Sequence, residues 1–325
     1  SFKIIIENAM ADLPNQKEGW EKEILEKVVL SSLREQRRTR LWSIFFRSLA
    51  FAYLFILLFW GMGLLGDDAA SSSDRHTALI DVRGEIMPDS LSSADNVNAG
   101  LQKAFKDKNT AGVIIRINSP GGSPVQAGNI NDEIRRLRAK YPQIPVYAVI
   151  EDICASGGYY VAVAADKIFV DKASIVGSIG VVLDSFGFTG TLEKLGVERR
   201  LLTAGENKSF LDPFSPSDPK QREHARKMLG EVHEQFIRIV QHGRGDRLKD
   251  IPEIFSGMVW TGQKSIDLGL TDEIGNAEYV AREIIKVERI VDYTTKEGFA
   301  EHFAKRFGKV TADLFINTVS KWELR

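Results

Sequence analysis

The sequence predicts an α/β fold, built from βαβ units around a largely parallel sheet, that is attached to a single N-terminal transmembrane helix. Two patterns in the chain of 325 residues support this prediction. Residues 44–65 are almost uninterruptedly apolar, and beyond residue 76 short runs rich in β-branched residues alternate with helical stretches. Such alternation is typical of parallel sheets whose faces are covered by helices.

The apolar run at 44–65, IFFRSLAFAYLFILLFWGMGLL, is long enough to cross a membrane. About 22 residues of helix span roughly 33 Å, which matches a hydrocarbon core of ~30 Å. A cleaved signal peptide fits less well, because its apolar region is typically ~7 to 15 residues and ends in a small-x-small site. A buried core helix also fits less well, since such a helix is seldom apolar on every face.

Charges on the two sides of this run predict its orientation. Arginines crowd before the run and near its start, and aspartates follow it: Arg34, Arg37, Arg38, Arg40, Arg47, Asp67 and Asp68. Positive charge marks the cytoplasmic side, so we expect the chain beyond Asp67 to lie outside the cytoplasm. The chain then divides into a cytoplasmic segment with an amphipathic helix (1–41), the transmembrane anchor (42–66), a flexible tether (67–76), an extracytoplasmic domain (77–290) and a C-terminal extension (291–325).

Within the extracytoplasmic domain the first predicted strands are TALIDV, GVIIRI and PVYAVI. Predicted helices lie between and after them, at Ala94–Phe105, Val125–Arg138, Pro219–Gln241, Gly262–Asp267 and Ala277–Val287. Parallel strands end at one edge of a sheet, where α/β folds bind their ligands. The turns after these strands are therefore the first places to look for a site.

Composition narrows the possible functions. The net charge of -1 gives no reason to expect a nucleic-acid partner. The only cysteine, Cys154, cannot form an intrachain disulfide. No H-E-x-x-H pair or other metal-ligand spacing occurs. We therefore expect neither a metal nor a cofactor.

One glycine-rich turn, Asn118–Ser123 (NSPGGS), follows the strand GVIIRI and precedes a helix. It fits neither the phosphate-binding loop nor the dinucleotide fingerprint. Amides that point into open space at such a strand end are suited to stabilise an oxyanion. The alternative is an ordinary glycine turn.

A second turn, Cys154–Gly158 (CASGG), follows PVYAVI at the start of a predicted helix. Ser156 is a candidate nucleophile there, because its glycine neighbours leave the hydroxyl accessible. Spacing alone favours the simpler interpretation, in which Ser156 is a helix N-cap. The nucleophile-elbow pattern G-x-S-x-G is not met, since Cys154 occupies the first glycine position.

A serine nucleophile needs a base, and the histidines offer no suitable one. None lies in a glycine-rich or strand-end motif, and His224 and His233 lie on a charged helix where we expect them to be solvated. A lysine is the alternative, but at its ordinary pKa of ~10.4 only about one lysine in 2,500 is neutral at pH 7. Burial lowers that pKa, so a catalytic lysine should sit in an enclosed, mostly apolar pocket.

Lys208 satisfies part of this requirement, because Phe210, Leu211 and Phe214 follow it, whereas most other lysines lie on charged helix faces. The S-x-x-K sequence at Ser217–Lys220 looks like the motif of penicillin-binding proteins, but we interpret it as a chance match. It contains a proline, and neither S-D-N nor K-T-G occurs in the chain.

Five stretches together resemble the short form of the signal peptide peptidase A family, in the order found there. They are SPGG (119–122), ASGGYYVAVAADKI (155–168), SIVGSIGVV (174–182), AGENKSFLDPFSP (204–216) and VWTGQKSIDLGLTDEIG (259–275). The resemblance implies a crotonase-like (ClpP-like) fold and a serine protease with a Ser-Lys dyad.

The resemblance also implies roles for individual residues. Ser156 would be the nucleophile, Lys208 the general base, and Ser178 the residue that orients the lysine amine. The amide of Gly122 would help to bind the oxyanion, and we expect the amide of Ser156 to act with it. Lys208 is then expected to be enclosed, within hydrogen-bond reach of both Ser156 and Ser178.

A family member of this kind is expected to be a single-pass protein of the bacterial inner (plasma) membrane with a periplasmic catalytic domain. Its partners would be the lipid bilayer, hydrophobic peptides such as cleaved signal peptides, and further copies of itself in a bowl-like homo-oligomer. Two alternatives stay open, a crotonase-fold acyl-CoA enzyme and a non-enzymatic membrane scaffold. Cys154 as the nucleophile is a third, less favoured one.

Overall fold

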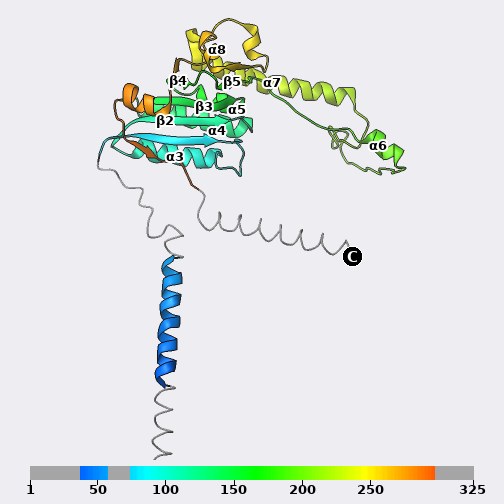
Figure 1. Ribbon diagram of the computed structural model, residues 1–325. Helices are drawn as coiled ribbons and strands as arrows, with labels where there is room; N and C mark the ends of the chain where they lie inside the picture. The colour runs from blue at the N-terminus through cyan, green and yellow to red at the C-terminus, as the bar shows by residue number, and fades with distance from the viewer. Residues whose placement is uncertain (1–36, 58–73, 297–325) are drawn as a thin grey trace, which may run out of the picture. The chain divides into compact units, whose positions relative to one another are not determined.

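The computed structural model describes residues 37–57 and 74–296, which form parts of two units (Figure 1). The first unit holds one described helix, Arg37–Leu57, with 21 residues and a mean hydropathy of 1.5. By length and composition this helix can cross a membrane. The predicted amphipathic helix before residue 37, the tether up to residue 73 and the C-terminal extension from residue 297 lie outside the described residues.

The second unit, residues 69–297, is built around an eight-stranded sheet with the order β6-β5-β3-β2-β1-β8. β4 pairs with β3, and β7 pairs with β4. All pairs are parallel except β5 with β6, which confirms the predicted α/β class. The strands are β1 (His76–Arg83), β2 (Thr110–Ser119), β3 (Val146–Ala155), β4 (Lys167–Val170), β5 (Ile175–Gly177), β6 (Val259–Thr261), β7 (Glu273–Ile274) and β8 (Ile290–Asp292).

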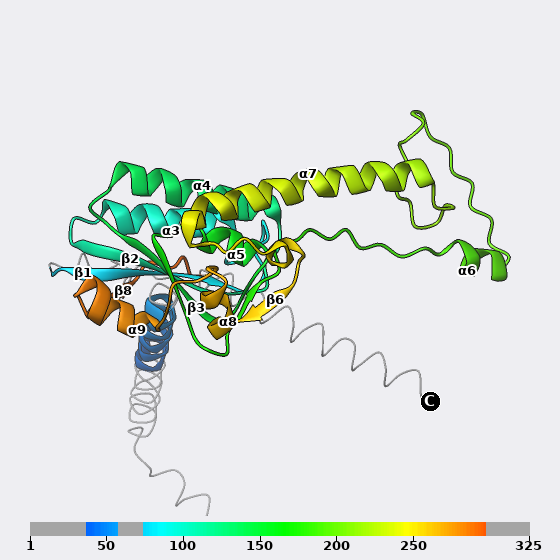
Figure 2. The same ribbon diagram turned by 90° about the horizontal axis from the view of Figure 1, so that it is seen from above.

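Helices cover both faces of the sheet, with α3, α4 and α5 on one face and α9 on the other (Figure 2). Caps fix where several begin: Ser93 accepts a hydrogen bond from the Asn96 amide at the start of α3, and Ser123 accepts one from the Gln126 amide at the start of α4. The α-helices are α3 (Ala94–Lys106), α4 (Pro124–Lys140), α5 (Gly157–Ala162), α6 (Thr189–Lys194), α7 (Pro219–Arg244), α8 (Gly262–Asp267) and α9 (Ala277–Tyr279).

The core has two layers because the central strands are buried on both faces, as parallel strands usually are. Ile115 and Ile117 of β2 face the larger cluster, which includes the apolar sides of α3, α4 and α5. Ile114 of the same strand faces a smaller cluster with Val149 and Phe169. A rigid sheet of this kind provides a fixed base for the turns at its C-terminal edge.

Strand β3 forks, and the fork positions the candidate site. Its first half pairs with β4, from Tyr147↔Lys167 onward, whereas its last residues pair with β5, ending at Ala155↔Gly177. The residues that follow this last pair are Ser156 and Ser178. Two turns that are distant in sequence therefore leave the sheet side by side.

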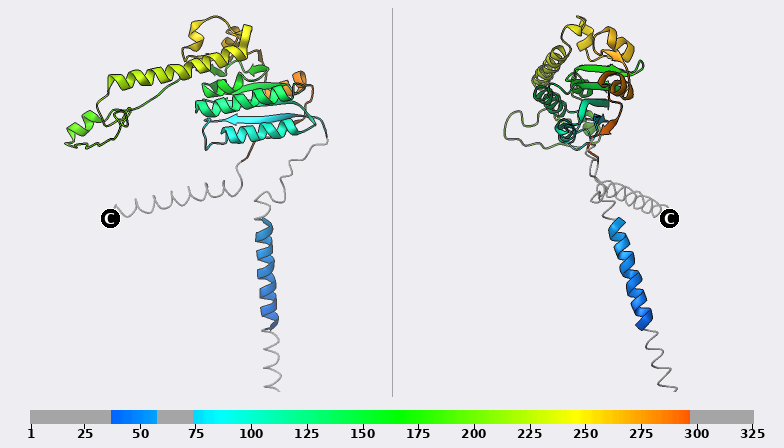
Figure 3. Two further views of the ribbon diagram at one scale, coloured as in Figure 1. Left: turned by 180° about the vertical axis from the view of Figure 1, so that it is seen from behind. Right: turned by 90° about the vertical axis from the view of Figure 1, so that its left-hand side faces the viewer.

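Residues 181–218, called the arm below, leave the sheet after β5 and lead into α7. Figure 2 shows α6 and the N-terminal end of α7 away from the sheet (also visible in Figure 3). α7 has 26 residues and ends at Arg244, slightly beyond its predicted end. Its second half carries the buried Phe236 and Val240, so the helix is fixed to the core near its C-terminus.

Candidate active site

Ser156 sits in a strained turn between β3 and α5. Its φ of 50° and ψ of -120° lie where residues other than glycine are uncommon. Ser156 occupies the N-cap position of α5, yet its side chain makes no capping hydrogen bond. The helix-cap interpretation therefore has no support in the geometry. Strand-to-helix turns with a strained serine expose the hydroxyl of nucleophile elbows in other enzymes.

The neighbouring turns hold Ser156 in this conformation. The Ser156 N–H donates to the Gly177 carbonyl at 2.9 Å, across the last pair of β3 and β5. On the other side Gly121, with φ of +106°, lies so close that a Cβ on it would stand 2.8 Å from the Ser156 Cβ and 2.7 Å from the Gly157 nitrogen. Only glycine fits there.

The same hydrogen bond corrects the expectation that the Ser156 amide binds an oxyanion, because this N–H is already engaged with Gly177. Two other amides nearby, those of Gly122 and Gly157, donate to no acceptor among the described residues. The Gly122 nitrogen lies 3.2 Å from where a Cβ on Gly157 would stand. Gly157 is therefore the candidate donor beside Gly122, and its position directly after the candidate nucleophile Ser156 was a signal available in the sequence.

Ser178 also has a positive φ, 53°. Its N–H donates to the Met258 carbonyl at 2.8 Å, so the short antiparallel strand β6 supports the turn that carries it. Ser178 is half-buried, as is Ser156. The structure thus brings Ser156, Ser178 and Gly122 to one place.

These three residues line one cavity of about 630 Å³. Most of its wall is apolar or uncharged and comes from the start of α4, from α5, from the first arm residues and from α7. The apolar contributors are Val125, Tyr160, Val181, Val182, Val232 and Phe236. An extended peptide with apolar side chains fits such a wall.

Lys208 does not line this cavity. It lies in a turn of the arm, where its N–H donates to the Gly205 carbonyl at 3.1 Å, and its side chain is exposed. The expected enclosure of Lys208 beside Ser156 and Ser178 is therefore not formed within a single chain. The physical reason is that the arm runs away from the sheet and packs mainly on itself, for example through the stacked rings of Phe188 and Phe214 at 5.3 Å.

The structure also shows the surroundings of Cys154 and of two histidines, His224 and His233. Burial raises the pKa of the Cys154 thiol, and its side chain is 0% exposed, which excludes it as an accessible nucleophile. His224 packs edge-on against Phe210. His233 was expected to be solvated, but it is half-buried, with its Nε2 3.1 Å from the Ile179 carbonyl oxygen. No histidine of the described residues lines the cavity that holds Ser156.

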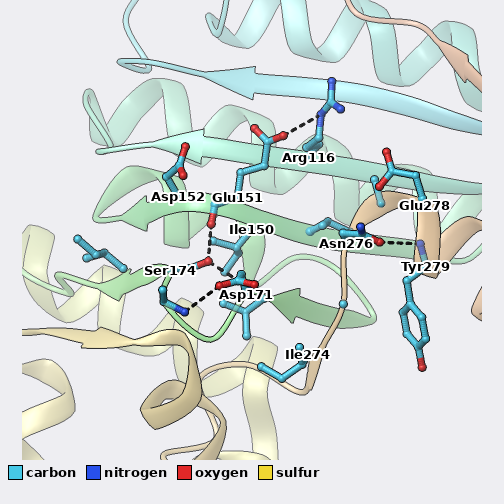
Figure 4. Close-up of a pocket in the computed structure, with 16 residues that line it drawn as sticks. Arg116, Ile150, Glu151, Asp152, Asp171, Ser174, Ile274, Asn276, Glu278 and Tyr279 are labelled. Atoms are coloured by element: carbon cyan, nitrogen blue, oxygen red, sulfur yellow. Dashed lines mark hydrogen bonds and ion pairs between the residues drawn. The ribbon is translucent and has the colours of Figure 1, made fainter.

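A second cavity, of about 790 Å³, lies elsewhere, between the fork of β3 and the α9 segment (Figure 4). Carboxylates dominate its polar lining, and Arg116 pairs there with Glu151 and with Asp81. Neither Ser156 nor Ser178 contributes to this cavity. Over residues 37–57 and 74–296 no group of three or more His, Cys, Asp or Glu side chains is arranged to hold a metal ion.

Comparisons with known proteins agree with this geometry. A sequence model described as "Peptidase family S49" matches residues 138–290. "Putative signal peptide peptidase SppA" of Enterococcus faecium is 30% identical over 197 residues, which are 61% of this chain and 57% of that protein. "Putative protease slr0021" of Synechocystis sp. is 30% identical over 211 residues, which are 64% of this chain and 73% of that protein.

Two Brucella proteins are more similar over a shorter stretch. "Na(+)/H(+) antiporter NhaA" of Brucella melitensis is 49% identical over 176 residues, which are 54% of this chain but 24% of that protein. The chain thus spans about a quarter of the length of the Brucella relatives and 57% of the Enterococcus one. The Synechocystis relative, most of which is covered, and the matching family model together show that the chain belongs to peptidase family S49.

Proposed function

We propose that this chain is a membrane-anchored serine endopeptidase that degrades hydrophobic peptides, such as residual signal peptides after preprotein processing. One observation carries the proposal: a strained Ser156 lies beside two free amides in a cavity whose wall includes several apolar side chains. Strain of this kind persists where the surrounding structure enforces it, commonly at functional sites. Membership of a peptidase family supports the same conclusion.

In the proposed mechanism, the neutral amine of Lys208 accepts the proton of the Ser156 hydroxyl, and the resulting alkoxide attacks the peptide carbonyl. The amides of Gly122 and Gly157 stabilise the oxyanion of the tetrahedral intermediate. The lysine then gives its proton to the leaving amine. Water, deprotonated by the same lysine, hydrolyses the acyl-enzyme and releases Ser156.

We propose that the general base of each site is Lys208 of a neighbouring copy of the chain. Lys208 lies on the arm and the cavity of the same chain lacks it, so an arm that reaches the next copy would complete that copy's site. The arm is suited to such a contact because it exposes large apolar side chains, with Val182 85%, Phe186 72% and Leu202 97% exposed. A head-to-tail contact of this type forms a ring if the rotation closes. Ser178 would then receive and orient the incoming amine.

The substrate class follows from the cavity and the anchor. The wall around Ser156 accepts apolar side chains, and the helix Arg37–Leu57 can hold the enzyme in a membrane. The arginines at the N-terminal end of the apolar run favour a cytoplasmic N-terminus and a catalytic domain on the other side. We therefore propose a single-pass protein of the bacterial inner membrane that acts on peptides left in or near the bilayer on its periplasmic side.

Peptidase assays on the full chain in detergent test this function. Ser156→Ala and Lys208→Ala are each expected to lower kcat by at least about a thousandfold, because the nucleophile and its base act as one unit. Lys220→Ala removes an exposed lysine of α7 that lies outside the cavity and should leave activity unchanged. A fluorophosphonate should label Ser156. Labelling at another residue, or full peptidase activity of Ser156→Ala, would contradict the proposal.

A further inference from the structure

The cavity that holds Ser156 contains one charged side chain, that of Asp132. Helix α4 presents five residues to the cavity, at positions 124, 125, 128, 129 and 132, and this spacing places them on a single face of the helix. Four of the five are uncharged, being Pro124, Val125, Gly128 and Asn129. Asp132 is therefore the one charged residue on the face of α4 that lines the cavity, and the uncharged residues of that face lie between it and the Gly122 turn.

The Asp132 carboxylate has no ion-pair or hydrogen-bond partner among the described residues, and the residue is exposed. Its neighbour Glu133 differs, because it pairs with Arg136 at 2.6 Å. Arg135, three residues further along the helix, interacts with the Asp132 charge without a direct ion pair, and its Nε donates to the Asn131 side chain at 2.7 Å. The cavity thus has one negative charge at its wall that forms no direct ion pair.

The charge of Asp132 affects Tyr160, which also lines the cavity. Burial raises the pKa of the Tyr160 hydroxyl, and the negative charge of Asp132 raises it further. Tyr160 packs against Phe236 of α7 with ring centroids 5.0 Å apart, and both rings line the same cavity as Asp132. A flexible side chain with a long apolar stem and a cationic head fits both features.

From these contacts we infer that Asp132 is a specificity-determining residue that binds a lysine or arginine side chain of the peptide substrate. The inference rests on the proposed peptidase function and narrows its substrate class to peptides in which a basic residue adjoins an apolar run. Signal peptides have this composition, with a positively charged region before the apolar one. The catalytic lysine of a neighbouring copy is a poorer occupant, because a carboxylate beside a lysine favours the charged form, which accepts no proton.

A set of matched peptides tests the inference on the full chain in detergent. Each peptide keeps the same apolar run and carries Lys, Gln or Glu at one position, which is moved stepwise along both sides of the cleaved bond. At one position the wild type should prefer Lys over Gln by roughly three- to fivefold in kcat/KM, the range of an exposed ion pair. Asp132→Asn should remove this preference, so that kcat/KM for the Lys peptide falls to that for the Gln peptide. Asp132→Lys should reverse it in favour of Glu.

Asp250→Asn is the matched control, since Asp250 is exposed and contributes to neither cavity. It should retain the wild-type preference. A Lys preference that survives in Asp132→Asn would overturn the inference while the peptidase function stands. An equal loss on all three peptides in a variant with unchanged melting temperature would also overturn it, and would point to a contact of Asp132 with a neighbouring arm. If the wild type cleaves no peptide and takes up no fluorophosphonate, the proposed function itself fails.

Discussion

Ser156 and Ser178 follow directly paired residues of neighbouring parallel strands, Ala155 of β3 and Gly177 of β5. Parallel strands lie about 4.8 Å apart, so the two serines leave the sheet close together. Both have a positive φ, 50° and 53°. The pair forms one side of a site that is open toward solvent, and the arm of the same chain does not close it.

Mixing two inactive variants tests whether Lys208 acts on a neighbouring copy. Ser156→Ala and Lys208→Ala should each be inactive alone. If the subunits assemble at random from equal amounts, a site needs an intact serine from one copy and an intact lysine from the next, so about a quarter of the sites should be active in a closed ring. Peptide hydrolysis measured after co-expression gives this fraction.

The double variant Ser156→Ala/Lys208→Ala mixed with wild type is the control for subunit exchange, and it should also give about a quarter of the wild-type sites in a random ring. Activity that stays at zero in the first mixture, although subunits that carry different affinity tags co-purify, would mean that Lys208 serves Ser156 of its own chain; the control should then keep about half of the wild-type sites.

The close approach of Gly121 to Ser156 and Gly157 predicts that position 121 requires glycine. In Gly121→Ala the new Cβ would lie 2.7 Å from the Gly157 nitrogen and 2.9 Å from the Ala155 carbonyl oxygen. The turn must shift, and displacements near 1 Å cost on the order of a hundredfold in rate. We expect that loss in kcat, with a decrease in unfolding free energy of roughly 1 to 3 kcal/mol.

Gly230→Ala is the matched control for this substitution. Gly230 lies within α7, and a Cβ there meets no atom within 4 Å. Alanine favours the helix by about 1 kcal/mol over glycine, so stability should rise and activity should not change. Equal activity of Gly121→Ala and the wild type would show that the oxyanion turn is not where we assign it.

The sequence was sufficient to predict the features that depend on local patterns. Hydrophobic periodicity predicted the parallel α/β class, and the caps Ser93 and Ser123 start α3 and α4 close to their predicted first residues. The turns of Gly122, Ser156 and Ser178 were also predicted to meet. That prediction came from the residue roles that the family resemblance implied, and periodicity alone did not give it.

The remaining features depend on contacts that have no local pattern. Whether the Ser156 amide is free depends on the forked pairing of β3, which places Gly177 opposite Ala155. Apolar residues after Lys208 suggested a buried lysine, but the pattern does not say which surface buries it. In a single chain Phe210 and Leu211 are half-buried and Phe214 is 42% exposed. His233 looked solvated because its helix is charged, yet the packed half of α7 turns it toward the Ser178 loop.

His233 is expected to act as a positioning residue for that loop. The Ile179 carbonyl can only accept a hydrogen bond, so the Nε2 of His233, 3.1 Å away, must donate. A single hydrogen bond contributes about 0.5 to 1.5 kcal/mol. We therefore expect His233→Leu to lower kcat up to about tenfold with little change in KM, and His233→Gln, which keeps a donor, to retain most of the activity.

Steady-state kinetics of the two His233 variants on one apolar peptide decides this prediction, with melting temperatures as the control for folding. A Gln variant as impaired as the Leu variant would mean that the ring itself, rather than its hydrogen bond, supports the loop. A Leu variant with wild-type kcat would show that His233 has no positioning role in the site.

The attachment of the C-terminal end of α7 to the core should depend on one buried ion pair. Arg244 is 1% exposed, and its guanidinium donates to both carboxylate oxygens of Asp272, at 2.8 and 2.9 Å. Burial alone would raise the pKa of the Asp272 carboxyl, but the hydrogen bonds and charge of Arg244 and the Ile168 amide hold it below its ordinary value. Asp272→Asn leaves the buried guanidinium without its counter-charge and should reduce unfolding free energy by about 3 to 5 kcal/mol at pH 7.

The direction of the pH dependence follows from the lowered pKa. The stabilisation is complete above the ordinary carboxylate pKa, near 4, and is lost as the pH falls through the lower pKa of the folded state. Urea unfolding at pH 7 and at pH 3 should therefore show a larger acid loss in the wild type than in Asp272→Asn. Glu223→Gln removes one partner of an exposed pair with Lys227, both 69% exposed, and should change stability by less than about 0.5 kcal/mol. Equal acid sensitivity of the wild type and Asp272→Asn would mean that this ion pair does not hold α7, and with it the arm, to the core.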